Sequence, residues 1–190
     1  MTIVEEKQAQ RRAGRAARRA LPEEVRAAAN AALCRHVLEL DAFRTARSIL
    51  LYAAFGGEAD LSAFAAEAAR MGKQLAYPVC GEGFSLTAAV PGPDGWEVGQ
   101  YGIRTPVLER SVLLEPEQLD LVLVPCTAFD GDCYRVGMGK GYYDRYLPRC
   151  TRAAKVGIAF EVQRVNHAAV DEHDQRLDAF VTERGLYRWK

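Results

Sequence analysis

The sequence predicts an α/β protein, a single three-layer α/β/α domain around a mostly parallel sheet, covering residues 1–190. Short continuous apolar runs at 48–54, 121–124 and 155–160 are typical of strands buried on both faces. Helical patterns separate these runs, and strands that alternate with helices favour a parallel sheet between two helical layers. The length of 190 residues suits one domain with a full core, and the sequence has neither an internal repeat nor a low-complexity linker.

Residues 3–20 are predicted to form a helix with a basic face. Its cations recur every three to four positions and therefore lie along one side, while alanines fill much of the remainder. They are Lys7, Arg11, Arg15 and either Arg18 or Arg19. Three roles are open for this face: a solvated surface, which composition alone favours, a nucleic-acid arm, or a clamp over a polyphosphate.

The next elements follow from caps and periodicity. A second helix begins at 21–24, where Pro22 suits the first turn, and its apolar period of 3.6 continues to about residue 40. His36 falls on or beside the apolar stripe, which favours a packing or capping role. Further predicted elements are a strand at 48–54, a helix at 60–71, a strand at 74–79 and an edge strand at 84–90.

The second half of the chain begins with a segment that has no clear helical or strand periodicity. Residues 91–117 are rich in Pro and Gly and predict a loop with short extended pieces, around Trp96 and at 101–103. The strand at 121–124 leads into a glycine-rich loop and a short helix that ends before Pro148. The strand at 155–160 comes next, and a short hairpin at 179–182 and 186–189 closes the chain.

Composition narrows the function classes. Acidic and basic residues are equal in number, and a net charge of zero argues against bulk electrostatic capture of nucleic acid or a membrane. The five cysteines are odd in number and never spaced C-x-x-C, so neither a disulfide framework nor a structural zinc site is expected. The N-terminus lacks an apolar signal core, and no apolar run approaches membrane length. A cytoplasmic protein without nucleic-acid or membrane partners is predicted.

The stretch at 122–147 carries the main functional signal. It reads VLVPCTAFDGDCYRVGMGKGYYDRYL and has glycines at alternate positions, Gly137, Gly139 and Gly141. Glycines allow close backbone approach, and successive free N–H groups can wrap an anion. The helix start behind them adds partial positive charge. Phosphate is the predicted guest.

The loop matches neither common nucleotide motif. Tyr134 occupies the first glycine position of the G-x-x-x-x-G-K-[ST] phosphate loop, and Gly141 replaces its Ser/Thr. Tyr142 replaces the last glycine of the dinucleotide fingerprint. A plain surface loop is the competing interpretation. The density of chemistry-bearing side chains favours a binding role; these are Arg135, Lys140, Tyr142, Tyr143, Asp144 and Arg145.

Ligands of open α/β sheets collect beyond the carboxyl ends of strands. The turn at 56–58, the loop at 137–141 and the turn at Glu161 are therefore predicted to lie at one rim. There Glu58 has two equally supported roles, as a pocket carboxylate that binds a polar heterocycle or cation, or as an exposed acid at a helix start.

Magnesium is the metal to consider beside a phosphate loop. It takes only one or two protein carboxylates, with water and phosphate oxygens completing its shell. Asp144 adjoins the loop and is the first candidate, and Asp174, from the late acids at 171–178, is the second. His167 and His173 lack the partners of a metal site and are assigned to none.

The central stretch VPCTAFDGDCYRVGMGKGYYDRYL resembles the signature of the 5-formyltetrahydrofolate cyclo-ligases, also called methenyltetrahydrofolate synthetases. The resemblance extends over nearly the whole chain. Lys7-x-x-x-Arg11, LLYAAFGGEAD, WEVGQYGIRTP and DEHDQRLDAFVTE are similar to further segments of that family. The central motif is long and specific, whereas the flanking ones are weak by themselves.

This resemblance implies an enzyme that uses Mg-ATP to convert 5-formyltetrahydrofolate, with or without a polyglutamate tail, to 5,10-methenyltetrahydrofolate, ADP and phosphate. A monomer is expected. The implied ATP ligands are Lys7, Arg11, Arg135, Gly137, Met138, Gly139, Lys140, Gly141, Tyr142 and Tyr143. Ala53, Glu58 and Tyr142 would meet the folate, and Asp144 and Asp174 would bind Mg²⁺.

The implied chemistry suits these residue types. The amide-like formyl oxygen is a poor leaving group and must be phosphorylated before N10 attacks the formyl carbon. No covalent enzyme nucleophile is needed, so catalysis rests on positioning and on neutralising charge at the transferring phosphoryl group. Lys140, Arg145 and the loop amides suit that electrostatic role.

The sequence departs from the family pattern at three positions. Cys126 and Cys133 stand where glycines are common, and Thr105 stands where a glutamate often precedes the proline. These departures bear on folate fit and loop geometry more than on ATP. Two other functions therefore stay open: an ATP-dependent ligase or phosphotransferase for another small molecule, and a non-catalytic nucleotide or RNA binder.

Overall fold

The computed structural model describes residues 2–99 and 102–188, and one eight-stranded sheet organises them. In spatial order the strands are β12 (Gly185–Tyr187), β11 (Ala179–Thr182), β10 (Ala154–Ile158), β7 (Leu121–Pro125), β1 (Ser48–Leu50), β2 (Gln74–Cys80), β3 (Leu86–Pro91) and β6 (Ser111–Leu114). The five from β11 to β2 are parallel, while β12, β3 and β6 pair antiparallel. The predicted mostly parallel sheet is confirmed.

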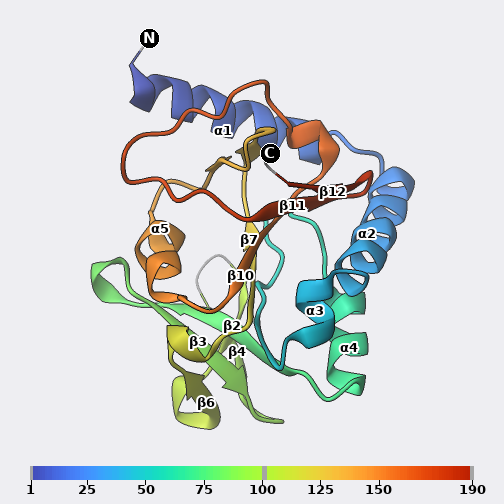
Figure 1. The fold of residues 1–190 in the computed structure, drawn as a ribbon, viewed down its shortest axis with the longest axis vertical. Coiled ribbons are helices and arrows are strands. Elements are labelled where there is room, and N and C mark those ends of the chain that lie inside the picture. The colour runs from blue at the N-terminus through green and yellow to red at the C-terminus, as the bar shows by residue number, and fades with distance from the viewer. Residues whose placement is uncertain (1, 100–101, 189–190) are drawn as a thin grey trace.

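Helices cover both faces of the sheet, as Figure 1 shows. On one face lie α2 (Glu23–Leu38), α3 (Asp41–Thr45) and α4 (Ser62–Arg70), and on the other α5 (Tyr142–Tyr146) with the 3-10 turn Leu147–Arg149. Successive strand residues serve opposite faces. Ile49 packs with the α2–α4 side, and its neighbour Leu50 packs with the α5 side. The three-layer α/β/α prediction is therefore confirmed.

The first predicted strand is longer than the observed one. It was expected at 48–54, whereas β1 ends at Leu50. The Leu51 amide still donates to the Ala76 carbonyl (2.8 Å), and Leu51 and Tyr52 stay buried. An apolar run indicates that its residues are buried, not that they pair with a neighbouring strand. The run therefore continues past the end of the strand.

The prediction that 84–90 is an edge strand is wrong, because β6 pairs along the outer side of β3. β6 lies in the 91–117 segment predicted as a loop. It has little apolar alternation to reveal it, since the adjacent Val112 and Leu113 are both exposed. The same segment holds a separate two-stranded ribbon, β4 (Trp96–Val98) and β5 (Arg104–Pro106). The expected extended piece at 101–103 lies partly outside the described residues.

The C-terminal hairpin is confirmed by the antiparallel pair of β11 and β12. The predicted second arm, 186–189, begins one residue after the start of β12, and Trp189 lies outside the described residues. The short helix before Pro148 is also confirmed, as α5.

The N-terminal helix α1 (Ile3–Arg19) crosses the upper edge of the sheet in Figure 1. Gly14 faces the Thr127 carbonyl so closely that a Cβ would lie 1.8 Å from its oxygen. Arg18 is 1% exposed and donates to the carbonyls of Gly56 (3.1 Å) and Cys126 (3.2 Å). The solvated surface that composition favoured is therefore wrong for this part of the helix, which is docked through a glycine and a buried cation.

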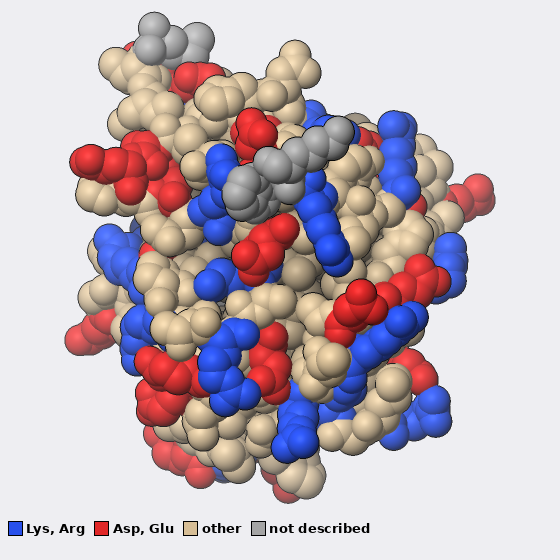
Figure 2. Space-filling model, in the orientation of Figure 1, with Lys and Arg blue, Asp and Glu red and all other residues tan. Residues whose placement is uncertain are grey.

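Surface charge is mixed on the face seen in Figure 2, where Lys and Arg atoms alternate with Asp and Glu atoms. This agrees with a formal net charge of zero. None of the helices in the described part of the chain combines the length and apolar composition needed to cross a membrane.

Candidate active site

A cavity of about 1430 Å³ lies beneath α1, at the carboxyl ends of the central strands. Residues predicted for nucleotide, metal, acceptor and catalysis all line it. They are Lys7, Arg11, Ala53, Glu58, Arg135, Gly137, Met138, Gly139, Lys140, Gly141, Tyr142, Tyr143, Asp144, Arg145 and Asp174. Glu161, predicted at the same rim, instead accepts hydrogen bonds from Thr182 Oγ1 and Tyr187 Oη outside the cavity.

The glycine loop follows β9 (Arg135–Val136), the partner of β8 (Ala128–Phe129) in a small hairpin. Gly139 and Gly141 have φ of +104° and +70°, a region that side chains rarely adopt. The Gly137 carbonyl accepts from Arg11 Nε (2.9 Å), which joins α1 to the loop. Two of the three glycines are therefore demanded by backbone conformation, and the third is where α1 attaches.

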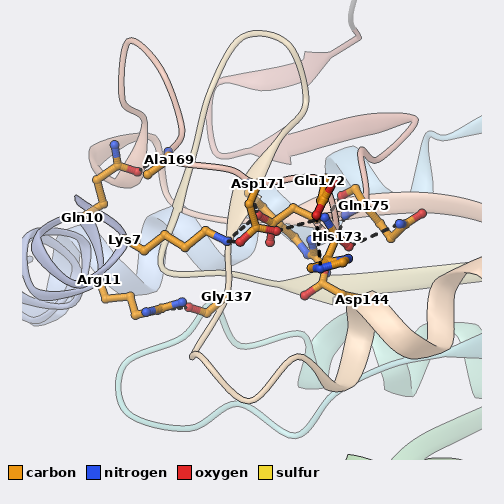
Figure 3. A network of polar contacts seen from close by, with 12 residues as sticks. Lys7, Gln10, Arg11, Gly137, Asp144, Ala169, Asp171, Glu172, His173 and Gln175 are labelled. Carbon is orange, nitrogen blue, oxygen red and sulfur yellow. Dashed lines mark hydrogen bonds and ion pairs between the residues drawn. The ribbon is translucent and has the colours of Figure 1, made fainter. Parts of the chain in front are cut away.

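A second segment, 167–175, is attached to α1 through Lys7 and Gln10 (Figure 3). Lys7 Nζ donates to the carboxylates of Asp171 (2.6 Å) and Asp174. One turn later, the Gln10 side chain donates to the His167 carbonyl and accepts from the Ala169 amide. The helix therefore bridges the glycine loop and the 167–175 segment over the cavity.

Charge within this bridge shifts the pKa values of its groups. Burial lowers the pKa of Lys7, but the hydrogen bonds that Lys7 donates to Asp171 and Asp174, with the charges of these carboxylates, outweigh it, and the net shift is upward. The pKa of Asp171 is lowered, first by the Lys7 hydrogen bond and then by that of the His173 amide. Both groups stay charged at neutral pH.

Arg135 and Asp144 form the floor beside the loop. Arg135 is 2% exposed, and it donates through Nη2 to Asp144 Oδ1 (2.9 Å) and through Nη1 to the Gln175 carbonyl (3.2 Å). The Gln175 amide donates to the same Asp144 oxygen (3.2 Å). Arg135 Nε is buried without a partner. This guanidinium fixes Asp144 at the start of α5.

The two predicted magnesium ligands fit the metal. Asp144 uses Oδ1 and Asp174 uses Oδ2 in hydrogen bonds, which leaves one oxygen of each without a hydrogen bond among residues 2–99 and 102–188. No cluster of three potential ligands occurs in those ranges. Mg²⁺ that is held mainly by phosphate and water needs only one or two carboxylates, which this site provides.

Glu58 lines the same cavity. Its Oε2 accepts from the Phe55 amide (3.1 Å). Burial raises the pKa of Glu58, against the lowering effect of that hydrogen bond and of the Arg18 and Arg15 guanidinium groups. Tyr143 Oη is buried nearby in the cavity wall without a partner. Of its two predicted environments, Glu58 therefore occupies the pocket and not an exposed helix start.

The two cations predicted for catalysis differ in their surroundings. Lys140 is exposed, and its ammonium group has no hydrogen bond or ion pair in the part of the chain that the structure describes. Arg145 Nη1 donates to the carbonyls of Lys140 and Gly141, both at 3.1 Å. Its guanidinium lies 5.0 Å from the centroid of the Phe84 ring. Lys140 is available to a ligand, whereas Arg145 is already placed against a ring.

Comparison with known proteins decides the family. The 5-formyltetrahydrofolate cyclo-ligase family matches residues 3–183. The chain belongs to this family. The Escherichia coli K12 5-formyltetrahydrofolate cyclo-ligase is 30% identical over 149 residues, which are 76% of this chain and 82% of that protein. The chain is thus a member of a family of ligases.

A shorter match covers only part of a relative. The Mycoplasma pneumoniae 5-formyltetrahydrofolate cyclo-ligase is 46% identical over 70 residues, and the match spans 42% of that protein and 36% of this chain. Among solved structures, the Aquifex aeolicus 5,10-methenyltetrahydrofolate synthetase has a TM-score of 0.85 and 33% identity, and covers 97% of this chain and 93% of that one. The fold is therefore shared along almost the whole length.

The departures from the family pattern have different consequences. Cys133 has a φ of +63°, in the left-handed region that explains why glycine is common there. It is buried, as is Cys126, and neither lines the cavity. Thr105 does line the cavity. Of the three, only Thr105 can touch a bound molecule there.

Sequence reasoning did not name several residues that line this cavity. Arg15 was placed on the basic face, whose three roles stayed open, and was not named as a ligand-binding residue; its Nε is buried without a partner, and its Nη2 lies 3.5 Å from Met138 Sδ. Its spacing, one turn after Arg11, was the available signal. Arg104 and Gln175 also line the cavity; they lie in the segments WEVGQYGIRTP and DEHDQRLDAFVTE, but neither was assigned a role from the sequence.

Proposed function

We propose that this protein converts 5-formyltetrahydrofolate to 5,10-methenyltetrahydrofolate, with ATP converted to ADP and phosphate and with Mg²⁺ bound. One observation carries the proposal. A single cavity, about 1430 Å³ in volume, brings the phosphate-binding loop, the two acids and Glu58 together in a member of the cyclo-ligase family. Such a volume exceeds that of typical small-ligand pockets, about 300–1,000 Å³, and suits two substrates at once.

The nucleotide occupies the end beneath α1 in this proposal. Lys7, Arg11 and Arg135 surround the triphosphate, together with the loop from Gly137 to Tyr143. Asp144 and Asp174 would hold Mg²⁺, which would supply positive charge beside the phosphate groups. Lys7 then exchanges its contacts with Asp171 and Asp174 for phosphate oxygens.

The folate occupies the wall formed by Ala53, Glu58 and Tyr142. A carboxylate that is half-buried and hydrogen-bonded to the Phe55 amide keeps a fixed orientation, so Glu58 can accept N–H groups of the pteridine ring. The hydroxyl of Tyr143, buried without a partner, is a further hydrogen-bonding group in the same wall. This end orients the formyl group toward the glycine loop.

The reaction is a phosphoryl transfer followed by ring closure. The formyl oxygen takes the γ-phosphoryl group of ATP, and ADP leaves. N10 then attacks the formyl carbon, its proton is lost, and the carbon–oxygen bond breaks to release phosphate. The side chains contribute position and positive charge. We assign to Lys140 the role of stabilising negative charge on the transferring phosphoryl group, because its ammonium group is exposed in the cavity. The sequence predicts that Arg145 shares this role, but its guanidinium lies over Phe84.

The test is formation of the methenyl chromophore from 5-formyltetrahydrofolate and Mg-ATP, with ADP measured in parallel. Lys140→Ala is expected to lower kcat by roughly two orders of magnitude, as loss of a group that stabilises transition-state charge does. Its melting temperature should stay near that of the wild-type protein, because the side chain is exposed. Lys155→Ala, a lysine outside the cavity, is the matched control.

Wild-type protein that forms no chromophore rejects the folate assignment. A Lys140→Ala variant with normal turnover and a large loss of stability would make the loop structural instead.

Thr105 supports a second candidate, an ATP-dependent ligase or phosphotransferase for another small molecule. It lines the cavity where a glutamate is frequent in the family, so the acceptor itself can differ. Stabilisation by Mg-ATP without stabilisation by folates favours this candidate.

A further inference from the structure

One cation of α1 is buried where the helix meets the edge of the sheet. Arg18 is 1% exposed, and its hydrogen-bond partners in the described ranges are the backbone carbonyls of Gly56 (from Nε, 3.1 Å) and Cys126 (from Nη1, 3.2 Å). Gly56 belongs to the turn at 55–58, after β1, and Cys126 directly follows β7, the neighbour of β1 in the sheet. A buried charge is costly unless it is hydrogen-bonded, so this guanidinium joins two segments in one defined geometry.

The Cys126 side of this contact is firmly anchored. The Cys126 carbonyl also accepts from Gln163 Nε2 (2.9 Å), and the same nitrogen donates to the Thr127 carbonyl (3.1 Å). Gln163 is buried, and Gly14 of α1 packs against the Thr127 oxygen. Two buried side chains and the docked helix therefore meet at one point of the backbone. From this point Arg18 reaches the turn after β1.

That turn depends on its backbone contacts. Gly56 and Gly57 have φ of +59° and +81°, a region that glycine favours, and neither has a side chain with which to anchor the turn. The stem of Arg18 lies over it, since a Cβ added at Gly57 would be 3.8 Å from Arg18 Cγ. Within the turn, Glu58 Oε2 accepts from the Phe55 amide, and the Glu58 amide donates to the Phe55 carbonyl (3.2 Å). Whatever fixes the turn therefore also fixes the direction of the Glu58 carboxylate.

Positive charge from α1 also acts on Glu58. Burial raises the pKa of this carboxyl group, whereas the Phe55 hydrogen bond and the guanidinium groups of Arg18 and Arg15 lower it. The other titratable groups that interact with its charge are buried hydroxyl and thiol groups, those of Tyr52, Cys126 and Tyr143. Burial raises the pKa of all three, so they are neutral at pH 7. Among these neighbours, only the two arginines favour the ionised form of Glu58.

We propose that Arg18 is a positioning residue for the folate: it holds the turn at 55–58 against the end of β7 and keeps the Glu58 carboxylate ionised and directed into the cavity. The inference rests on the proposed function, in which Glu58 accepts N–H groups of the pteridine ring. An ionised carboxylate only accepts hydrogen bonds, whereas a protonated one presents an O–H donor. Because Arg18 belongs to α1, the helix that covers the nucleotide also sets the geometry of the folate wall.

The first experiment removes the charge of Arg18 and follows Glu58 directly. Arg18→Met keeps an unbranched apolar stem and loses the charge with both hydrogen bonds. NMR titration of the Glu58 carboxyl group in ligand-free protein, assigned with Glu58→Gln, should show a higher pKa in Arg18→Met than in wild type, because a nearby cation favours the carboxylate. Arg18→Gln, which keeps an N–H donor for the carbonyls, tests the same expectation should the methionine variant not fold.

Kinetics separate this role from general damage to the helix. Arg18→Met should raise KM for 5-formyltetrahydrofolate about tenfold at pH 7, the loss expected when a hydrogen bond to a charged group is misplaced. The KM for ATP and kcat should change much less. The decline of kcat/KM on the acid side should move to higher pH, since a Glu58 with a higher pKa is protonated sooner as pH falls. Arg18→Lys keeps the charge and should restore the acid side of the profile.

Arg19→Met is the matched control. Arg19 follows Arg18 on the same helix and packs on the same turn, where a Cβ added at Gly57 would be 3.7 Å from Arg19 Cγ. It is exposed, so the variant removes one positive charge without removing a buried contact. It should leave both the Glu58 pKa and the KM for folate close to their wild-type values.

A Glu58 pKa that is unchanged or lower in Arg18→Met overturns the proposal. An equal rise in KM for ATP and for folate, with the acid side of the profile unmoved, overturns it as well, because Arg18 would then only dock α1. In a Glu58→Gln background, Arg18→Met should add little to KM for folate, and a further rise of about tenfold contradicts action through Glu58. Failure of the proposed function appears differently, as absence of methenyl product from wild-type protein at every pH, and it leaves the NMR titration intact.

Discussion

Lys7 is a cation predicted to bind phosphate, and in the structure its partners are the carboxylates of Asp171 and Asp174. Its side chain is 13% exposed, as against 39% for Asp171 and 14% for Asp174. The contact joins the first helix to a segment near the end of the chain, 164 residues away. At the scale of one residue, the group that binds nucleotide in our proposal also holds the closing segment in place.

This contact predicts a pH dependence of stability. The lowered pKa of Asp171 means that its contribution is present above its unfolded pKa, about 4, and is lost as pH falls through the folded pKa. The raised pKa of Lys7 means that the contribution is present below about pH 10 and is lost at more alkaline pH. Asp171→Asn should therefore lower the free energy of unfolding at pH 7 by about 0.2–1 kcal/mol, a value suited to a solvent-screened pair.

Urea denaturation across a pH series measures this. The difference between Asp171→Asn and wild type should shrink as pH falls through the lowered folded pKa of Asp171, and disappear once the carboxylate is protonated. Glu172→Gln, at the exposed neighbouring acid, is the control and should have a smaller effect at pH 7. A difference that stays constant from pH 7 to pH 2 would show that the effect of Asp171→Asn is not electrostatic.

At the scale of elements, α1 is held against the sheet edge by shape as much as by charge. Gly14 and Arg18 are its buried residues, and Lys7 and Arg11 lie farther along the same side. A Cβ at position 14 would be 1.8 Å from the Thr127 oxygen, so the helix approaches this closely only with glycine there. The docking of the helix sets where its cations meet the glycine loop.

Gly14→Ala tests this dependence. In an exposed helix the change stabilises by roughly 0.5–1 kcal/mol, but here overpacking should destabilise the protein by about 1–3 kcal/mol. The affinity for ATP should fall at the same time, because Lys7 and Arg11 move away from the loop. Denaturation and nucleotide titration measure the two effects. Ala13→Gly, at an exposed position of the same helix, should lower stability modestly and leave ATP affinity unchanged. A Gly14→Ala protein as stable as wild type would contradict the close contact.

At the scale of the whole molecule, one cavity serves both substrates, so each ligand should stabilise the fold separately. A ligand present at about a hundred times its Kd adds about 2.7 kcal/mol to stability. For a domain of this size the melting temperature then rises by roughly 5–10 °C. Thermal melts with Mg-ATP alone and with 5-formyltetrahydrofolate alone should each show such a rise. A rise with Mg-ATP but not with folate would favour the alternative ligase, and no rise with Mg-ATP would contradict the nucleotide site.

Sequence reasoning recovered most of the fold because the central strands and their helices have local signatures. The strand predicted at 121–124 and the helix predicted at 60–71 are examples, and both match the observed element boundaries within a few residues. β6 was missed because an exposed antiparallel strand has no such run. Local periodicity in the sequence indicates which residues are buried. Where a strand is mostly exposed, its formation depends on hydrogen bonds to the neighbouring strand, which the sequence pattern does not reveal.

By itself, the sequence determined the family, the order of elements and the chemical groups of the site, since long motifs and residue types are properties of the chain. Tertiary structure alone decided which groups meet. It sets Lys7 against Asp171 and Asp174, docks α1 through Gly14, and places the Arg145 guanidinium 5.0 Å from the centroid of the Phe84 ring. Such contacts depend on the packing of segments far apart in sequence, where only the complete fold determines distance and direction.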